Sequence, residues 1–243
     1  MLYACMKSEK IKIRRSFIWL AFFLIPIVPA IMGVQNYLNN LLYLKSGWYS
    51  LWTQVTLFYT DFFFAPLIAI YCSYLWRLEN QNKNRNMLLT APVKVSHIFF
   101  GKLIIIARIT FLTQLWLLAL YLTAGKLAGL PGLPPAQLFA YTLRGCPGGL
   151  MIAALQLLIS MQIRSFATPI AVAVIGSITG FLASNSSFGI LYPYSLMVLG
   201  MNANKSEDML AGNGILFFVS CLAYLILFCG CAVLLLKKQD VKA

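Results

Sequence analysis

Six long apolar runs, separated by short polar connections, form the dominant pattern along the chain. About 20 apolar residues, at a rise of ~1.5 Å per residue, cross the hydrocarbon core of a bilayer as one helix. We expect the spans at 17–34, 55–76, 103–124, 148–163, 167–184 and 215–236. The fourth run is short, which leaves open a start upstream of the break at 145–149. The pattern predicts an all-α integral membrane protein with six transmembrane helices in a single domain over residues 1–243.

Composition agrees with a membrane protein. The chain is 60% hydrophobic and only 10% charged, far from the balance of a globular domain. Its six cysteines suggest no disulfide framework, and we interpret them as small buried hydrophobic residues.

Basic residues concentrate on one side of the expected spans. The other side holds only four of the 19 lysines and arginines, namely Lys45, Lys126, Arg144 and Lys205, while Arg108 falls inside the third span. By the positive-inside rule, both termini are expected in the cytoplasm. The net charge of +13 is therefore a topology signal, with attraction to anionic lipid headgroups as a second contribution. Nucleic-acid binding is disfavoured, because these cations are scattered over membrane-proximal loops without a recognition fold.

Catalytic motifs are missing from the sequence. A phosphate-binding GxxxxGK[ST] loop is excluded, because Ser96 stands at the required glycine position before Gly101-Lys102 and Leu103 follows. We find no HExxH or GxSxG motif and no paired intramembrane carboxylates. We therefore expect this chain to be no enzyme, to hold no metal and to bind no cofactor of its own.

Residues 77–102 form a polar, asparagine-rich connection between the second and third spans. Met87, Leu88 and Leu89 form a short apolar turn within it, and Pro92 bends the chain by keeping Ala91 out of helical geometry. An apolar knob on a basic connection could insert into a cleft on a soluble partner. The alternative is that it packs on its own helical bundle.

Residues 1–16 precede the first span and mix apolar with basic positions. This pattern suits a short amphipathic entry helix in the headgroup region, although a simple basic flank that stops translocation explains it equally well. Pro26 and Pro29 predict a kink in the first span, because each lacks an N–H group and crowds the preceding turn.

Short motifs spread along the chain resemble one transporter family. The order Glu79, Leu88-Leu89-x-x-Pro92-Val93, Ile98 and Gly101-Lys102 resembles the cytoplasmic-loop signature of type-2 ABC exporter permeases. The form ENQNKNRNMLLTAPV is closest to the lantibiotic-immunity and bacitracin-resistance branch. KSEKIKIRRS at the start and the segment around Tyr192-Pro193-Tyr194 resemble further parts of that branch, with Tyr194 in place of an expected Trp.

The resemblance implies a half-transporter that pairs with a second permease, as a homodimer or a heterodimer. A separate ABC ATPase, in two copies, would carry ATP and Mg²⁺ and engage the 77–102 connection. The residues expected to couple the two proteins are Glu79, Met87, Leu88, Leu89, Pro92 and Val93. Residues 185–213 would form an extracellular loop with short re-entrant or surface helices around 191–201.

Two charged residues lie within expected spans. Asp61, about two turns from the outer end of the second span, should face a cavity or a partner, since an unpaired acid is costly in the bilayer. It is a candidate for the substrate path through contact with a cationic peptide, with a structural pair or hydrated helix end as the alternative. Arg108 can extend to the membrane surface, and we interpret it as structural.

Small and aromatic residues give two further interpretations. Gly176 and Gly180 continue a stripe of small residues that could contact the second permease or another helix of the same chain. Aromatic side chains of the first outer connection suit a belt at the membrane surface: Tyr37, Tyr43, Trp48, Tyr49 and Trp52.

The function expected from these observations is the permease subunit of an ATP-driven exporter in the bacterial plasma membrane. Its cargo would be a lantibiotic or related antimicrobial peptide, removed from the lipid bilayer for self-immunity or resistance. A type-2 permease for a lipid or small drug shares the same motifs. A non-transporting membrane scaffold or sensor subunit is the second alternative.

Overall fold

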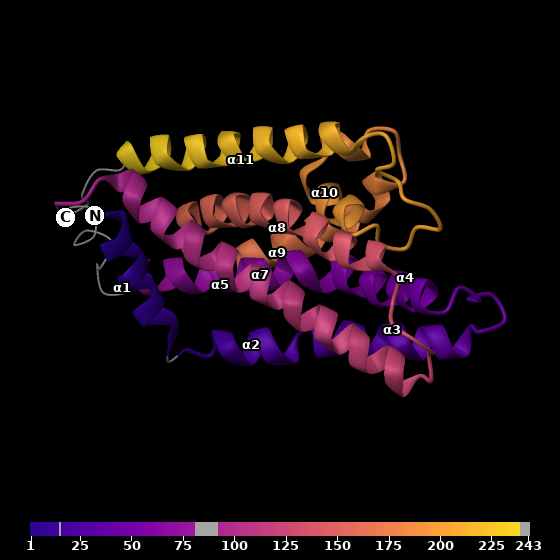
Figure 1. The fold of residues 1–243 in the computed structure, drawn as a ribbon. Coiled ribbons are helices and arrows are strands. Elements are labelled where there is room, and N and C mark those ends of the chain that lie inside the picture. The colour runs from indigo at the N-terminus through magenta and orange to yellow at the C-terminus, as the bar shows by residue number, and fades with distance from the viewer. Residues whose placement is uncertain (15, 81–91, 239–243) are drawn as a thin grey trace.

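The computed structural model describes residues 1–14, 16–80 and 92–238, and this part of the chain is helical without strands (Figure 1). A first helix precedes the bundle, and short helices η2 and α10 precede the last span. The elements are α1 (Leu2–Arg14), α2 (Ile18–Leu24), α3 (Ile27–Asn39), α4 (Trp48–Phe58), η1 (Tyr59–Phe63), α5 (Phe64–Asn80), α7 (Val95–Leu127), α8 (Ala136–Gln162), α9 (Ala167–Ser184), η2 (Gly189–Leu191), α10 (Pro193–Gly200) and α11 (Gly214–Lys237).

Six helices in the described residues are long and apolar enough to cross a membrane, which confirms the predicted number. The fifth span has the predicted bounds, and the sixth differs by one residue at each end. The fourth is much longer than 148–163, because α8 begins at Ala136. Gly145 and Gly149 do not break this helix; both instead permit close contacts with side chains of neighbouring elements.

Two spans depart from regular α-helix at prolines or next to them. The first span is interrupted after Leu24 and resumes at Ile27, with Pro26 capping the second piece, so the predicted kink is present. The second span runs from Trp48 to Asn80 with a π-helical turn, η1, in its middle. Pro66 follows that turn, and its ring would crowd the carbonyl of Phe62 in a regular helix.

The second span forms the centre of the bundle. Its α5 segment packs against α8 and α9, and α8 also packs against α10 and α11. Hydroxyl groups bind between helices: Ser73 of α5 meets Ser160 of α8 at 3.2 Å, and Tyr71 of α5 meets Thr113 of α7 at 3.1 Å. Hydrogen bonds of this kind join helices where lipid gives no hydrophobic drive for association. In contrast, α11 exposes a long apolar face, including Ile215 and Ile226.

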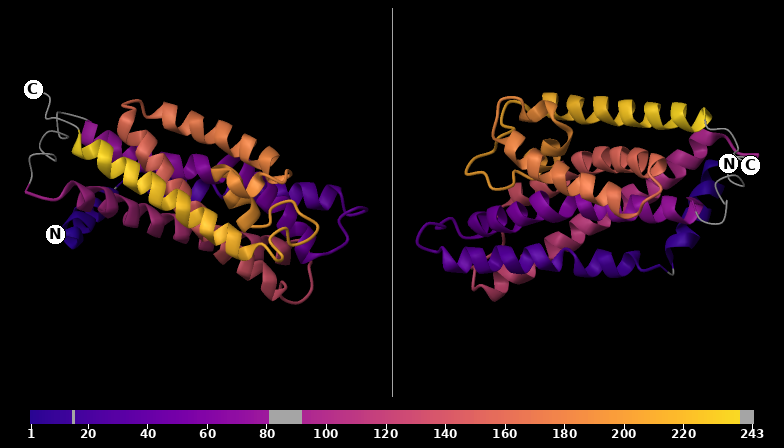
Figure 2. Two further views of the ribbon diagram at one scale, coloured as in Figure 1. Left: turned by 90° about the horizontal axis from the view of Figure 1, so that it is seen from above. Right: turned by 180° about the vertical axis from the view of Figure 1, so that it is seen from behind.

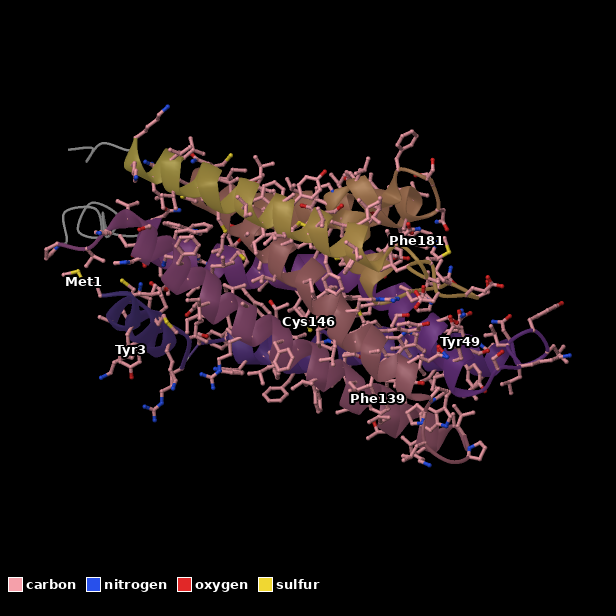
Figure 3. All side chains as sticks on the ribbon, turned by 45° about the horizontal axis from the view of Figure 1, so that its top comes forward. Met1, Tyr3, Tyr49, Phe139, Cys146 and Phe181 are labelled. Carbon is pink, nitrogen blue, oxygen red and sulfur yellow. The ribbon has the colours of Figure 1, made fainter. Side chains whose placement is uncertain are left out.

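The helical bundle has two distinct ends. At one, which we call the terminal end, lie α1, the last turn of α5, the start of α7 and the end of α11 (Figures 1 and 2). At the other, the distal end, lie the connection between α3 and α4 and the connection between α10 and α11. Figure 3 places Tyr49 at the distal end, far from Met1 and Tyr3.

The prediction of an aromatic belt on the first outer connection is largely wrong. Trp48 and Trp52 belong to α4 and are 6% and 0% exposed, packed edge-on against Tyr121. Trp52 donates its indole N–H to the Met201 carbonyl at 3.0 Å. Only Tyr43 of the five stays well exposed, at 84%. The helix begins earlier than the hydropathy pattern indicates, so these rings are drawn into the bundle.

The short helices predicted near 191–201 are present, but α10 is not a surface helix. Residues 194–200 are all buried between α8, α9 and α11. Tyr194 accepts a hydrogen bond from the Gln156 side chain of α8 at 2.8 Å. The segment therefore folds back into the bundle from the distal end.

Candidate functional site

Four charged side chains join three helices at the terminal end. Lys102 Nζ of α7 lies 3.0 Å from Glu9 Oε1 of α1 and 2.9 Å from Glu79 Oε1 of α5. Lys12 of α1 pairs with the same two carboxylates, at 2.7 Å from Glu9 and in direct contact with Glu79. We call Glu9, Lys12, Glu79 and Lys102 the ion cluster. Two positive and two negative charges balance within it.

Three of the four side chains of the ion cluster are withdrawn from solvent, whereas Lys12 is 25% exposed. The Lys102 side chain is 0% exposed, and those of Glu9 and Glu79 are 5% and 7% exposed. The Lys102 ammonium also lies 5.0 Å from the Trp76 ring centroid, a cation–π contact that helps to replace its hydration. Burial lowers the pKa of Lys12, but Glu9 and the hydrogen bond to Glu79 raise it more, so the net pKa lies above 10.5.

Local sequence explains how α1 brings Glu9 and Lys12 to Lys102. Glu9 and Lys12 are three residues apart on α1, which places them on one helix face. Gly101 permits α1 to approach α7, because a Cβ at that position would lie 3.0 Å from the Cys5 Cβ. That close contact brings α1 over Lys102. The cluster was not predicted from the sequence, although Glu79, Gly101 and Lys102 belong to the quoted signature.

Three of the six coupling residues expected in the 77–102 connection lie in the described structure. Glu79 is buried in the ion cluster, whereas Pro92 is exposed and Val93 is half-buried where the chain re-enters the described structure. Val93 also lines a cavity of about 230 Å³ beside Cys5, Glu9 and Lys12. Met87, Leu88 and Leu89 lie outside the described residues. The ion cluster therefore lies beside both described ends of the connection.

Asp61 lies deeper in the second span than predicted, because the helix begins already at Trp48. Its side chain projects from η1, is 3% exposed and accepts a hydrogen bond from Thr60 Oγ1 at 3.0 Å. Lys205 at the distal end provides an opposite charge: burial lowers the pKa of Lys205, and Asp61 partly opposes that effect. In this conformation Asp61 is closed off from solvent, and its part in a substrate path stays a prediction.

Gly176 and Gly180 of α9 make their close contacts within the chain. A Cβ on Gly180 would lie 2.7 Å from the Tyr194 backbone, and one on Gly176 would lie 2.4 Å from the Tyr194 ring. The stripe of small residues thus accommodates α10. This arrangement supports the within-chain alternative over a contact with a second permease.

The comparison with known families decides the class of protein. The sequence pattern of the ABC-2 family transporter proteins matches residues 5–180, more than half of the chain. This chain belongs to the ABC-2 transporter family. The matched range contains all four residues of the ion cluster, the first four spans and most of the fifth, which ends at Ser184. No individual curated protein matches the permease.

Family membership establishes the coarse function. The chain is a permease, the membrane subunit of an ABC transporter. Permeases of this family generally work with an ATPase subunit. The chain's six apolar helices make it a multi-pass membrane protein. In bacteria, a permease of this family lies in the plasma membrane. Within the described residues, no group of three or more His, Cys, Asp or Glu side chains is arranged to hold a metal.

Proposed function

We propose that the chain is the permease subunit of an ATP-driven exporter that removes a lantibiotic or related antimicrobial peptide from the bilayer. The observation that carries the transport part of this proposal is the ion cluster. It ties α1 to α5 and α7, the two helices that flank the 81–91 segment, so a force on that segment is transmitted to three helices together. The peptide cargo is supported by the ENQNKNRNMLLTAPV form of the connection.

The expected topology follows from charge. Lys7, Lys10, Arg77 and Lys94 lie at the terminal end, so the positive-inside rule assigns that end to the cytoplasm. Two copies of a separate ABC ATPase, which carry ATP and Mg²⁺, would bind there. A second permease, identical or homologous, completes the transporter. Closure of the ATPases would push the connection and shift the bundle between two access states.

The test replaces Leu88 and Leu89 together by aspartate in cells that express the permease with its ATPase. We expect ATPase co-purification and peptide resistance to be lost, while membrane insertion is retained. The matched control is aspartate at Leu127 and Leu133, which are 89% and 82% exposed at the distal end. The control should keep ATPase binding, because those leucines lie far from the connection.

Each other outcome identifies an alternative. Normal resistance and ATPase binding in the Leu88/Leu89 variant would refute the coupling role. Resistance assays against lantibiotics, lipid substrates and small drugs separate the peptide exporter from a permease for another cargo. Purification of the wild type without any ATPase would favour the scaffold or sensor.

A further inference from the structure

A cavity of about 300 Å³ lies between α1 and α7, away from the ion cluster's own side chains. Three cations line it: Lys10 and Arg14, one turn apart on α1, and Arg108 on α7. All three side chains are exposed. Among the described residues, none of the three forms an ion pair, although Lys12 on the same helix forms two. The cavity therefore gathers positive charge that no acidic side chain among the described residues pairs with.

The same cavity has an apolar floor. Ile13, Ile105 and Ile109 line it and are 3%, 7% and 4% exposed. Trp19 forms a further wall, and its indole N–H donates to the Ile13 carbonyl at 3.2 Å, which fixes the ring against the end of α1. The hollow is thus formed by packed side chains and combines a cationic rim with a hydrophobic interior.

The position of Arg108 adds a second argument. It is an exposed arginine well inside a helix that crosses the membrane, 13 residues after Val95. A guanidinium at such a place is costly unless it meets a counter-ion or polar headgroups. Arginine recognises phosphate oxygens through paired, charge-assisted hydrogen bonds. A phosphate held jointly by α1 and α7 could accept hydrogen bonds from all three cations.

We propose that this cavity binds one anionic phospholipid, with its phosphate among Lys10, Arg14 and Arg108 and an acyl chain against Ile105 and Ile109. Basic pockets between membrane helices attract anionic headgroups, and the apolar floor gives the acyl chain a surface that a free phosphate cannot use. The lipid bridges α1 to α7 and strengthens the docking that the ion cluster begins. The site does not depend on which cargo the transporter carries.

The experiment titrates the purified full chain in mild detergent with brominated phosphatidylglycerol, whose acyl chain quenches tryptophan fluorescence on contact. We expect saturable quenching that Trp19→Phe largely removes, since Trp19 lines the cavity. Removal of cations in the Lys10→Gln/Arg14→Gln variant should weaken binding by about fivefold for each charge lost. Arg108→Gln removes one charge from the opposite wall of the cavity, so it should weaken lipid binding by about fivefold.

The matched control is Lys7→Gln/Lys237→Gln, which removes the same net charge from two exposed lysines that do not line the cavity. It should bind the lipid as the wild type does. Equal weakening in control and cavity variants would overturn the proposal in favour of diffuse surface attraction. Equal quenching by brominated phosphatidylcholine would reduce the site to an apolar groove. Complete competition by millimolar inorganic phosphate would identify a free-anion site instead.

Discussion

The two ends of the bundle hold their polar residues in opposite ways. At the terminal end, four charged side chains from α1, α5 and α7 form ion pairs with one another in the ion cluster. At the distal end, polar side chains also bind main-chain carbonyls at the end of α10 and in the connection after it: Arg144 donates to Gly200 O at 3.0 Å and Tyr49 to Lys205 O at 2.9 Å. One end depends on charge balance and the other on backbone position.

This difference predicts how each end responds to change. In the ion cluster, loss of one charge leaves buried charge unbalanced, so the effect spreads over three helices. At the distal end, each hydrogen bond fixes one point of a connection, and its loss has a local cost. The terminal end suits an element that must move as a unit, whereas the distal end can be adjusted one contact at a time.

The largest effect is expected for Lys102→Met. The variant leaves two buried carboxylates with Lys12 alone, and breaking a buried ion pair from one side costs about 3–5 kcal/mol. Thermal unfolding of the purified protein in detergent measures the loss. Lys7→Met, at an exposed position of the same charge on α1, should unfold as the wild type does.

A charge-balanced variant sharpens this prediction. Lys102→Met combined with Glu79→Gln restores neutrality around Lys12 and Glu9, so it should be more stable than Lys102→Met alone. If the double variant is the less stable of the two, packing and not charge controls this end, and the contrast between the ends fails.

An intermediate effect is expected for Gly180→Ala at the distal end. The added methyl group would meet the Tyr194 backbone at 2.7 Å, and overpacking of this kind costs about 1–3 kcal/mol. Gly230→Ala is the matched control, because a Cβ there meets nothing within 4 Å and alanine favours the helix by up to about 1 kcal/mol. Unfolding and crosslinking between permeases are measured together. A loss of crosslinking without a loss of stability would show that these glycines contact the second permease.

Hydropathy was sufficient to predict the six spans, because lipid selects for length and apolarity of each helix separately. The start of α8 at Ala136 could not be read this way, since polar residues such as Gln137 and Arg144 interrupt the run before its apolar part. The same limit applied to Trp48 and Trp52, which look like interface aromatics but are covered by Tyr121 and the α10 connection. When a side chain is buried by segments distant in sequence, its burial leaves no periodic pattern in the residues around it.

The ion cluster was also out of reach of local patterns. Glu9 and Glu79 are two of only six acids in the chain, and each lies close to a membrane entry, which is the one signal that could have singled them out. Their pairing with Lys102 depends on α1 folding back over α7 at Gly101, a contact between residues about 90 positions apart. The resemblance to the family signature singled out Glu79 and Lys102, but it did not explain why these two positions carry charged side chains.

The smallest effect is expected where a charge pair is partly open to water. Arg144 binds Asp208 through two hydrogen bonds of 2.9 and 2.8 Å, with side chains 18% and 33% exposed, so solvent screening limits Arg144→Met to about 1 kcal/mol. The Arg144 hydrogen bonds hold the pKa of Asp208 below its ordinary 3.8. A depressed pKa means that this stability is present above pH 3.8 and is lost as the pH falls through the folded-state value.

The difference in unfolding temperature between wild type and Arg144→Met should therefore shrink as the pH is lowered below 3.8. Taking the difference removes the contribution of other acids, which titrate in both proteins. Lys45→Met, an exposed cation at the same end, should show no such dependence. A difference that stays constant down to strong acid would mean that Arg144 acts through the Gly200 carbonyl alone, and the distal end would then contain no charge pair that contributes to stability.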